Sequence, residues 1–573
     1  MFITDAKLQL IPYKYLPADF QIRCWDTVKA YMEELCSLDN SSVEALEIMI
    51  EKYSELLKAM SDELSWLYIR MTLAADDQSK ADDYNEYFAN VYAPTEAYQF
   101  NIKQIYSESP AKESMDSRFG LLNQIFTKDL AIFREENIPL QIKESELANK
   151  YGSLVSKMSA YFQGEERTPA QLSVFLKDPD RSTREAAWRL RFGLYEAKQD
   201  ELNSLFDELK TVRSDIATNA GFANYRDYKH TEMGRFSYTP DDIFAFHNAV
   251  EKVVIPFVKE LEAKRQTALG LSSLKPWDMT VDLDGRKLNP FQTTDEFIQK
   301  SLKVLNKVQP AYAEQLEMMF NTGLLDLENR KGKAPGGYNT GINNLASSFI
   351  FMNHVKLHND VITLLHEAGH AMHSAAMKHI KIAQYLETPS EVAELASMTM
   401  ELLTMDYWDE FYPNKDDLKK AKRDQMEGTL SFLPWCMIVD AFQHWVYLNP
   451  LHTPAERFNA YLDISKRFTA TVDWSGLEQY RKLGWMMQLH IFEVPFYYIE
   501  YGMAQLGALS IYMNYRKDKT KALQQYQDFL ELGYSKQVSD IYQAAGIKLD
   551  FSENHIRDLV DFVKSELSEI EKL

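Results

Sequence analysis

The spacing of apolar residues along the chain predicts a protein built mainly from α-helices. After Ser41-Ser42-Val43-Glu44, which resembles a capping box, apolar residues recur three or four positions apart from Leu46 to Met60, as on one face of a helix. The chain shows no internal repeat, and 21 glycines and 19 prolines among 573 residues are low counts, as expected for helices. The same periodicity runs through residues 61–75, 118–135, 183–218, 241–268, 293–320 and 415–430.

Two short stretches favour β-strands. Residues 346–353 form an apolar run, and residues 279–283 precede Asp284-Gly285 in a hairpin-like pattern. A small sheet is therefore expected next to a mostly helical structure. Helical periodicity breaks near 163–169, and we expect an N-terminal helical region over residues 1–180 and a second region over 181–573.

Composition narrows the class of protein. The 63 basic and 84 acidic residues give a net charge of −21, which disfavours nucleic acid and anionic membranes as partners. No long uncharged apolar run predicts a membrane span, and the first residues lack the pattern of a secretory signal. Three cysteines without metal-binding spacing indicate reduced thiols and a cytoplasmic location; they are Cys24, Cys36 and Cys436.

One pentapeptide carries the clearest chemical information. His366-Glu367-Ala368-Gly369-His370 has the pattern HExxH. On a helix, residues four apart lie about 40° apart around the axis, so His366 and His370 can bind one metal ion from the same face. Glu367 then lies where a carboxylate can take a proton from a water molecule. The alternative is a buried amphipathic helix that carries two histidines by chance.

A catalytic zinc site needs a third protein ligand and one open position. The chain has no third histidine at the HExxHxxGxxH spacing, so a carboxylate is the other option. Glu391, Glu394 and Glu401 share one face of a predicted helix that Ser390 can cap. Because the residues around them are mostly apolar, at least one of these carboxylates is expected to have a buried partner.

These segments resemble the oligoendopeptidase F branch of the thimet-type oligopeptidases. In that family HExxH is followed about two dozen residues later by a ligand glutamate in a stretch like E-x-x-S-x-x-x-E, which the segment from Glu394 to Glu401 fits. The resemblance implies one Zn²⁺ per chain, bound by His366, His370 and Glu394, with Glu391 as the alternative to Glu394. Further matching segments are Pro276-Trp277-Asp278, the loop 333–338, the run 349–353 and a tyrosine-rich stretch near 490–501.

The resemblance also implies a fold and a set of acting residues. The expected fold is a mainly α, two-lobed zincin-type metallopeptidase with a small sheet beside the HExxH helix and a deep substrate channel. Glu367 would be the general base, and the family's use of a histidine and tyrosine hydroxyls for the oxyanion implies His490, Tyr498 and Tyr501 here. Tyr498 and Tyr501 are three apart, so their hydroxyls can converge from one helical face; the alternative is an aromatic core stripe.

Substrate binding is expected around residues 336–353. Glycines let a loop approach a ligand closely, and the free edge of the 346–353 strand could pair with an extended peptide. The alternative is an ordinary turn and core strand. The candidate substrate-binding residues are Gly336, Gly337, Tyr338, Ser348, Phe349 and Tyr497.

The function predicted from these features is a zinc endopeptidase that hydrolyses internal bonds of short, unstructured peptides. The resemblance implies peptides of roughly 5–20 residues, bound as an extended strand. One alternative is a metallocarboxypeptidase of related helical fold, which would need a cationic group for the substrate's C-terminal carboxylate. Another is a non-catalytic peptide-binding scaffold, against which the intact base Glu367 argues. The sequence carries no signal of oligomeric state.

Overall fold

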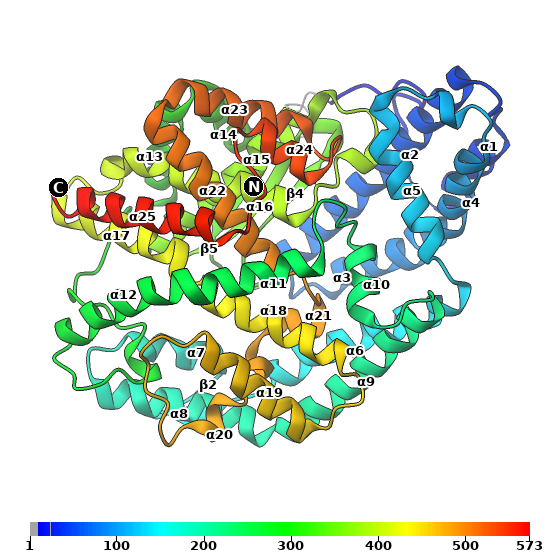
Figure 1. Cartoon of the computed structure of the whole chain (residues 1–573). Helices are drawn as coiled ribbons and strands as arrows, with labels where there is room; N and C mark the ends of the chain where they lie inside the picture. The colour runs from blue at the N-terminus through cyan, green and yellow to red at the C-terminus, as the bar shows by residue number, and fades with distance from the viewer. Residues whose placement is uncertain (1–9, 23) are drawn as a thin grey trace. The chain divides into compact units, whose positions relative to one another are not determined.

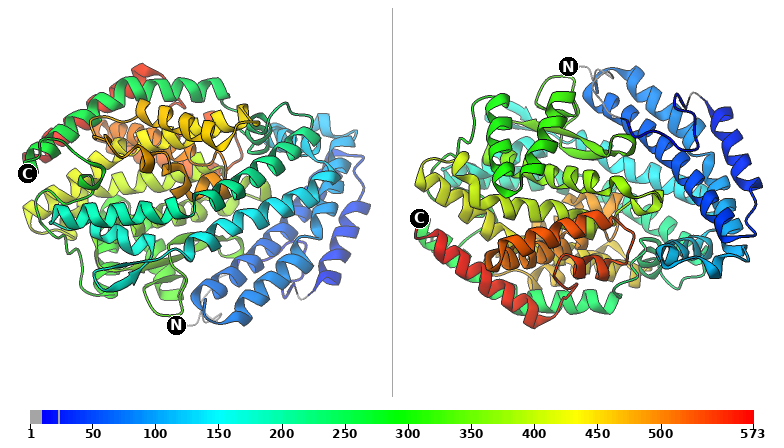
Figure 2. Two further views of the ribbon diagram at one scale, coloured as in Figure 1. Left: turned by 90° about the horizontal axis from the view of Figure 1, so that it is seen from below. Right: turned by 90° about the horizontal axis from the view of Figure 1, so that it is seen from above.

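The computed structural model describes residues 10–22 and 24–573, and most of its regular structure is helical (Figures 1 and 2). The prediction of a mainly α fold with a small sheet is therefore confirmed. The chain forms two compact units. Unit 1 comprises the described residues up to Leu130, Leu288–Ala421 and Gly507–Leu549; unit 2 comprises Ala131–Lys287, Lys422–Leu506 and Asp550–Leu573. The boundary that we expect near residue 180 falls within unit 2.

Unit 1 consists of helices around one three-stranded sheet. Helices α5, α17 and α22 carry the chain between the two units. Its elements are α1 (Trp25–Ser37), α2 (Val43–Leu73), α3 (Gln78–Tyr87), α4 (Thr95–Glu108), α5 (Gly120–Ile132), α13 (Thr294–Val308), α14 (Pro310–Thr322), β3 (Leu325–Glu328), β4 (Tyr338–Ile342), β5 (Ser347–His354), α15 (His358–Ala376), α16 (Ser390–Thr404), α17 (Lys415–Ser431), α22 (Ile499–Lys517), α23 (Lys519–Leu532) and α24 (Val538–Ala544).

Unit 2 is helical apart from one short hairpin. The strands β1 and β2 are antiparallel and pair through a tight turn at residues 163–164. Its elements are α6 (Ile138–Ser156), β1 (Ala160–Phe162), β2 (Glu165–Arg167), α7 (Pro169–Val174), α8 (Arg181–Ala197), α9 (Gln199–Asn219), α10 (Tyr225–Glu232), α11 (Pro240–Ala249), α12 (Ile255–Ala268), α18 (Leu433–Leu448), α19 (Pro454–Arg467), α20 (Glu478–Arg481), α21 (Leu489–Glu493) and α25 (Glu553–Ile570).

Several helices begin where a side chain satisfies one of their first N–H groups. Thr293 accepts a hydrogen bond from the N–H of Glu296 at the start of α13, whose apolar stripe is buried. Ser42 caps α2 by accepting from the N–H of Ala45, one residue later than the predicted box. Helix α16 begins at Ser390 with Pro389 as its N-cap, so the predicted capping role of Ser390 is wrong.

The three-stranded sheet of unit 1 has the order β3-β5-β4. β3 is parallel to β5, and β4 is antiparallel to it. Because β5 is paired on both sides, the prediction that residues 346–353 present a free edge is wrong. β3 and β4 are the edge strands of this sheet among the described residues. β5 leads directly into α15, which packs on the sheet, as expected for the HExxH helix.

Residues 279–283, all of which are described, form bends, and the predicted strand there is wrong. The guanidinium of Arg265 donates to the carbonyl oxygens of Asp278 and Val281 at 3.2 and 2.8 Å, and so satisfies acceptors that a neighbouring strand would otherwise bind. The buried carboxylate of Asp278 also binds Arg181 and Arg184 of α8 at 2.7 and 2.9 Å. The segment Pro276-Trp277-Asp278, which matches the family, therefore anchors this loop to α8.

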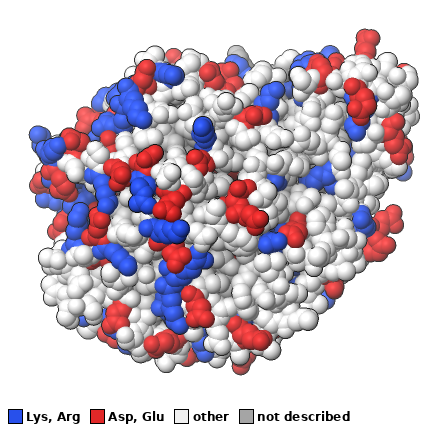
Figure 3. All heavy atoms as spheres, viewed as in Figure 1, with Lys and Arg blue, Asp and Glu red and all other residues white. Residues whose placement is uncertain are grey.

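Charged side chains are scattered among uncharged ones on the face drawn in Figure 3. On this face, acidic and basic side chains are interspersed. Some form pairs one helical turn apart, such as Glu185 with Arg189 at 2.8 Å, which contribute a few tenths of a kcal/mol each. Among the described residues, no helix is long and apolar enough to cross a membrane.

Candidate active site

Helix α15 presents the HExxH residues from a rigid position on the sheet. The carboxylate of Asp360 accepts hydrogen bonds from the N–H groups of Val355 and Leu357 at 2.9 and 2.7 Å, and so caps the start of the helix. On the β4 side, the side chain of Asn339 donates to the carbonyl oxygen of Glu367 at 3.1 Å. The motif is thus held by hydrogen bonds at the helix start and along its sheet-facing side.

His366, His370 and Glu394 bring one ligand atom each into a group whose members lie within 4.8 Å of one another. Oε2 of Glu394 lies 3.2 Å from Nε2 of His366 and 3.8 Å from Nε2 of His370. Among the described residues this is the only such group of histidine, cysteine and acidic side chains. Glu391 is buried on the same helix but does not belong to the group.

Glu401 orients the first histidine. Its Oε1 lies 2.7 Å from Nδ1 of His366. Because an ionised carboxylate only accepts hydrogen bonds, Nδ1 carries the proton and Nε2 turns its lone pair toward Glu394. This carboxylate–histidine pair is the arrangement that commonly supports metal ligands. Its sequence signal is the last glutamate of the stretch E-x-x-S-x-x-x-E.

The donor set fits zinc. Two imidazole nitrogens and one carboxylate oxygen are the ligands of a common type of catalytic zinc site. A lone pair of His366 and an oxygen of Glu394 at 3.2 Å repel each other unless a proton or a metal ion lies between them. Ser397 donates to Oε2 of Glu394 at 3.1 Å and steadies that carboxylate. The three side chains are therefore arranged as acceptors around a cation.

Burial and neighbouring charges shift the pKa values of these groups. Burial lowers the pKa of His370 to about 4 and raises the pKa of Glu367 to about 7. Burial also acts to lower the pKa of His366, but without a cation the doubly protonated ring donates to both Glu394 and Glu401, and these hydrogen bonds outweigh burial and hold that pKa above its ordinary value. A bound cation would favour the neutral imidazoles and ionised carboxylates that bind metals.

Gly369 sets the distance between the two helices that carry the ligands. A Cβ atom at this position would lie 2.6 Å from Cα of Ser397, 2.9 Å from the carbonyl oxygen of Ala396 and 3.1 Å from Cβ of Met400. Helices α15 and α16 can approach this closely because residue 369 has no side chain. The hydroxyl of Tyr526 further binds the carbonyl oxygen of Ala396 at 2.7 Å. The close approach of α15 and α16 at Gly369 therefore sets how near Glu394 comes to the histidines.

The predicted oxyanion residues form one aromatic cluster in unit 2. The ring centroid of His490 lies 4.9 Å from that of Tyr498 and 6.2 Å from that of Tyr501, and Tyr497 also packs against Tyr501. Tyr498 precedes α22, so Tyr498 and Tyr501 do not share a helical face as their spacing predicts. Their rings still approach to 5.5 Å. Burial raises the pKa of Tyr498 to about 12.

Two buried arginines hold the backbone between His490 and Tyr497. Arg213 donates to the carbonyl oxygens of Ile491 and Phe492 at 3.2 and 2.5 Å. Arg235 donates to the carbonyl oxygen of Phe496 at 2.6 Å, where φ is +66°, an uncommon conformation for a side chain of this size. Such well-supported strain is typical of functional segments.

The predicted substrate-binding residues have different surroundings. Ser348 and Phe349 are buried in the central strand β5, so their side chains are placed for packing, and the prediction that they contact substrate is not supported. Gly336 has a φ of +96°, and a Cβ at Gly337 would lie 3.3 Å from the carbonyl oxygen of Phe351. The backbone conformation at Gly336 and the close packing at Gly337 account for glycine at these positions without a bound substrate. Tyr338, in the edge strand β4, stacks on Phe351 of β5.

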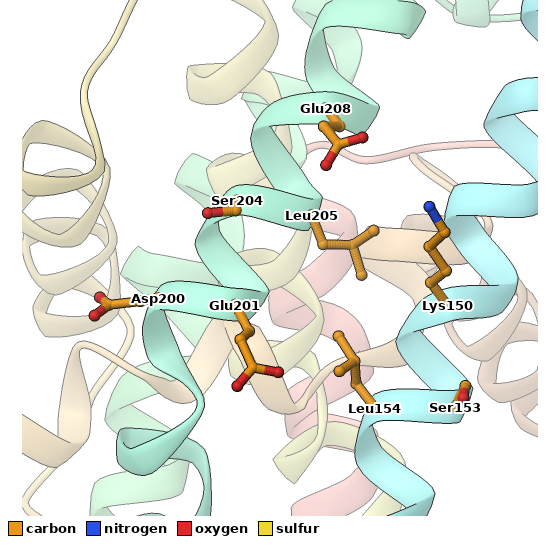
Figure 4. Close-up of a pocket in the computed structure, with 8 residues that line it drawn as sticks. All are labelled: Lys150, Ser153, Leu154, Asp200, Glu201, Ser204, Leu205 and Glu208. Atoms are coloured by element: carbon orange, nitrogen blue, oxygen red, sulfur yellow. The ribbon is translucent and has the colours of Figure 1, made fainter.

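Two hollows lie in unit 2, and none of the metal ligands lines them. One, of about 490 Å³, lies between α6 and α9, where Leu154 faces Leu205 and Lys150, Glu201 and Glu208 surround them (Figure 4). It is an open, charged groove between two helices. The other, of about 480 Å³, is lined in part by Glu144, Lys229, Glu493 and Tyr497, and so borders the aromatic cluster.

The helical fold and a site of two histidines and one glutamate define a metallopeptidase of the HExxH class. The sequence profile of peptidase family M3 matches residues 174–560. Because the match covers well over half of the chain, this protein belongs to peptidase family M3.

Individual relatives agree with this assignment. An oligoendopeptidase F homologue of Lactococcus lactis is 21% identical over 580 residues, which cover 93% of this chain and 90% of that protein. Oligopeptidase PepF of Bacillus subtilis is 23% identical over 411 residues, or 70% of this chain and 59% of that protein. A solved structure of PZ peptidase A with an inhibitor aligns with a TM-score of 0.87 at 28% identity, over 96% of this chain and 99% of that chain.

The predicted oligoendopeptidase F resemblance is thus confirmed, and the chain is a metallopeptidase with peptide substrates. The carboxypeptidase and scaffold alternatives are not favoured.

Proposed function

We propose that this chain is a zinc endopeptidase that cleaves internal bonds of short, unstructured peptides. The observation that carries the proposal is the convergence of His366, His370 and Glu394 within 4.8 Å, with Glu367 on the same helix turn, in a member of peptidase family M3. One Zn²⁺ would be bound by these three side chains. A cytoplasmic location is in keeping with the three cysteines, all of which are free.

Bound zinc would acidify a water molecule and polarise the scissile carbonyl group. Glu367 takes a proton from the attacking water and transfers it to the leaving amine, so that water and a peptide become a carboxylate and an amine. Burial raises the pKa of this carboxyl to about 7, in the range where a general base both accepts and returns a proton. Glu401 keeps His366 in the tautomer that a ligand needs.

The proposal assigns the oxyanion to His490, Tyr498 and Tyr501. Their rings pack together in unit 2, and their polar atoms are hydrogen-bond donors. Donors aimed at a developing negative charge are among the strongest contributions to catalysis.

Peptide binding is assigned to the edge strand β4 in place of β5. An extended peptide added to a sheet edge is held through its main chain, which tolerates many side chains. Asn339 of β4 donates to the carbonyl oxygen of Glu367 at 3.1 Å, so a peptide along this strand would lie near the base. A folded protein cannot present a backbone in this way, and substrates of roughly 5–20 residues follow from the resemblance and this binding mode.

The test is hydrolysis of internally quenched peptides of graded length, with products identified by mass spectrometry. Cleavage should fall at internal bonds, be abolished by a chelator and return with zinc, while a native folded protein remains intact. Release of single C-terminal residues from each peptide would favour a carboxypeptidase instead. Binding without cleavage in the zinc-loaded protein would favour the scaffold.

A further inference from the structure

A short chain of hydrogen bonds in unit 2 ends at the imidazole of His490. The indole Nε1 of Trp435, in α18, donates to Oε1 of Gln488 at 3.0 Å. Nε2 of Gln488 lies 2.6 Å from Nδ1 of His490. The three side chains come from two segments more than fifty residues apart in sequence, and the spacing of residues along the chain does not predict their contact.

The chemistry of these groups determines where the proton of His490 lies. An indole N–H can only donate, so the glutamine atom that faces Trp435 must be its carbonyl oxygen. The other end of the amide, which faces His490, is therefore the NH₂ group, which can only donate. Nδ1 of His490 must then accept, and a neutral imidazole that accepts at Nδ1 carries its proton on Nε2.

We propose that Trp435 and Gln488 are positioning residues that hold His490 as the Nε2–H tautomer, so that it acts as a neutral hydrogen-bond donor to the substrate carbonyl and not as a base. The inference rests on the proposed function for the role of His490 and on the hydrogen-bond chain alone for its tautomer. The substrate class is the peptide carbonyl oxygen as it gains negative charge.

Two observations support a donor that is ready for a ligand. Among the described residues, Nε2 of His490 has no hydrogen-bond partner in the protein, although its ring is only partly exposed. Burial lowers the pKa of this imidazole, and the side chains that contact it, Gln488 and the rings of Tyr497, Tyr498 and Tyr501, are uncharged at neutral pH. The neutral form that the hydrogen bonds require is thus the favoured one.

The residue that follows Trp435 in α18 contacts the neighbouring tyrosine. The thiol of Cys436 donates to the carbonyl oxygen of Tyr498 at 3.2 Å. Adjacent residues of α18 therefore orient both His490 and Tyr498.

Gln488→Glu is the decisive variant because it keeps the shape of the side chain and reverses its hydrogen bond to His490. A glutamate accepts from Trp435 with one oxygen and from Nδ1–H of His490 with the other, so the neutral ring loses its proton at Nε2. The carboxylate also raises the pKa of His490. Below that pKa the imidazolium still donates from Nε2; above it the donor is lost, so kcat of the variant falls as pH rises.

The tautomer is read directly by NMR of the zinc-loaded protein labelled with ¹⁵N-histidine, which contains 12 histidines. The His490 signal is assigned by its loss in His490→Gln. We expect a pyridine-like Nδ1 in the wild type and a pyridine-like Nε2 in neutral Gln488→Glu. Trp435→Phe, which frees the amide to rotate, should weaken the preference for either tautomer.

Hydrolysis of a quenched peptide provides the second measurement. Above the raised pKa, Gln488→Glu should lower kcat by about 10²–10³-fold with little change in KM. The matched control is Gln171→Glu, which adds the same charge in unit 2. Gln171 already accepts from the N–H of Thr168 at 2.8 Å in an exposed capping box, and glutamate serves equally there. This control should keep wild-type kcat and the wild-type His490 signal.

Each outcome separates the inference from the proposed function. A wild-type His490 protonated at Nδ1 would overturn the hydrogen-bond assignment, whatever the activity. A tautomer that changes in Gln488→Glu without a fall in kcat would overturn the role of the Nε2–H donor. A wild type that cleaves no peptide would reject the proposed function and the catalytic role with it, while the NMR spectrum would still decide the tautomer.

Discussion

Replacing Gly369 by alanine tests whether the closeness of two helices creates the metal site. The added Cβ would lie 2.6 Å from Cα of Ser397 and 2.9 Å from the carbonyl oxygen of Ala396. Both atoms belong to the backbone of α16, so no side-chain rotation relieves the clash. The helices must move apart until the carbon–carbon distance reaches about 3.5–4.0 Å, a displacement of about 1 Å.

The expected loss follows from this displacement. Glu394 lies one turn before Ser397 on α16 and moves with it, whereas protein–metal distances are held within about 0.2 Å. We expect zinc affinity to fall by at least about 10²-fold, the upper range for losing a residue that orients ligands. Overpacking should also lower the free energy of unfolding of the apo form by about 1–3 kcal/mol. The better helix propensity of alanine should offset up to about 1 kcal/mol of this loss.

Equilibrium zinc titration against a competing chelator and urea unfolding of the apo form measure the two effects. Gly193→Ala is the matched control because a Cβ at this position in α8 would meet nothing within 4 Å. That variant should be as stable as the wild type or up to about 1 kcal/mol more stable, with unchanged zinc affinity. Wild-type zinc affinity and stability in Gly369→Ala would refute the argument.

Four further predictions concern the acidic side chains and one tyrosine. Glu367→Gln should keep stoichiometric zinc but lose at least about 10³-fold in turnover; high turnover in the zinc-loaded variant would exclude Glu367 as the base. Glu394→Ala should weaken zinc binding far more than Glu391→Ala, and the reverse order in a titration would transfer the ligand role to Glu391. Glu401→Gln should weaken zinc binding by about 10-fold, and unchanged affinity would reduce Glu401 to a packing role. Tyr498→Phe should lower kcat by about 10²–10³-fold at constant KM. A change in KM or stability alone would show that Tyr498 only packs in the aromatic core.

Local patterns in the sequence predicted the features that depend on residues near one another in the chain: the main helices and the pair of histidines. Helical periodicity located the main helices, since an apolar stripe recurs with the turn of the helix. The HExxH pattern placed two imidazoles on one face because residues four apart on a helix are neighbours. The apolar residues around Glu391, Glu394 and Glu401 indicated that at least one of these carboxylates has a buried partner, and the family resemblance favoured Glu394 as the third ligand, with Glu391 as the alternative.

Tertiary structure decided what depends on contacts between distant segments. The order β3-β5-β4 places residues 347–354 in the middle of the sheet, which no alternation pattern within one strand reveals. Within residues 279–283 the carbonyl oxygen of Val281 accepts from Arg265 and not from a neighbouring strand, and bends form in place of the apparent strand.

The chemistry of the site depends on such contacts as well. Glu394 reaches the histidines because Gly369 lets α15 and α16 touch. Glu401, on α16 like Glu394, forms a hydrogen bond with His366 of α15. The proton of His490 is placed by a glutamine and a tryptophan that carry no motif. Sequence periodicity determines which side of a helix a residue occupies, whereas hydrogen-bond direction and distance across helices depend on how the chain packs.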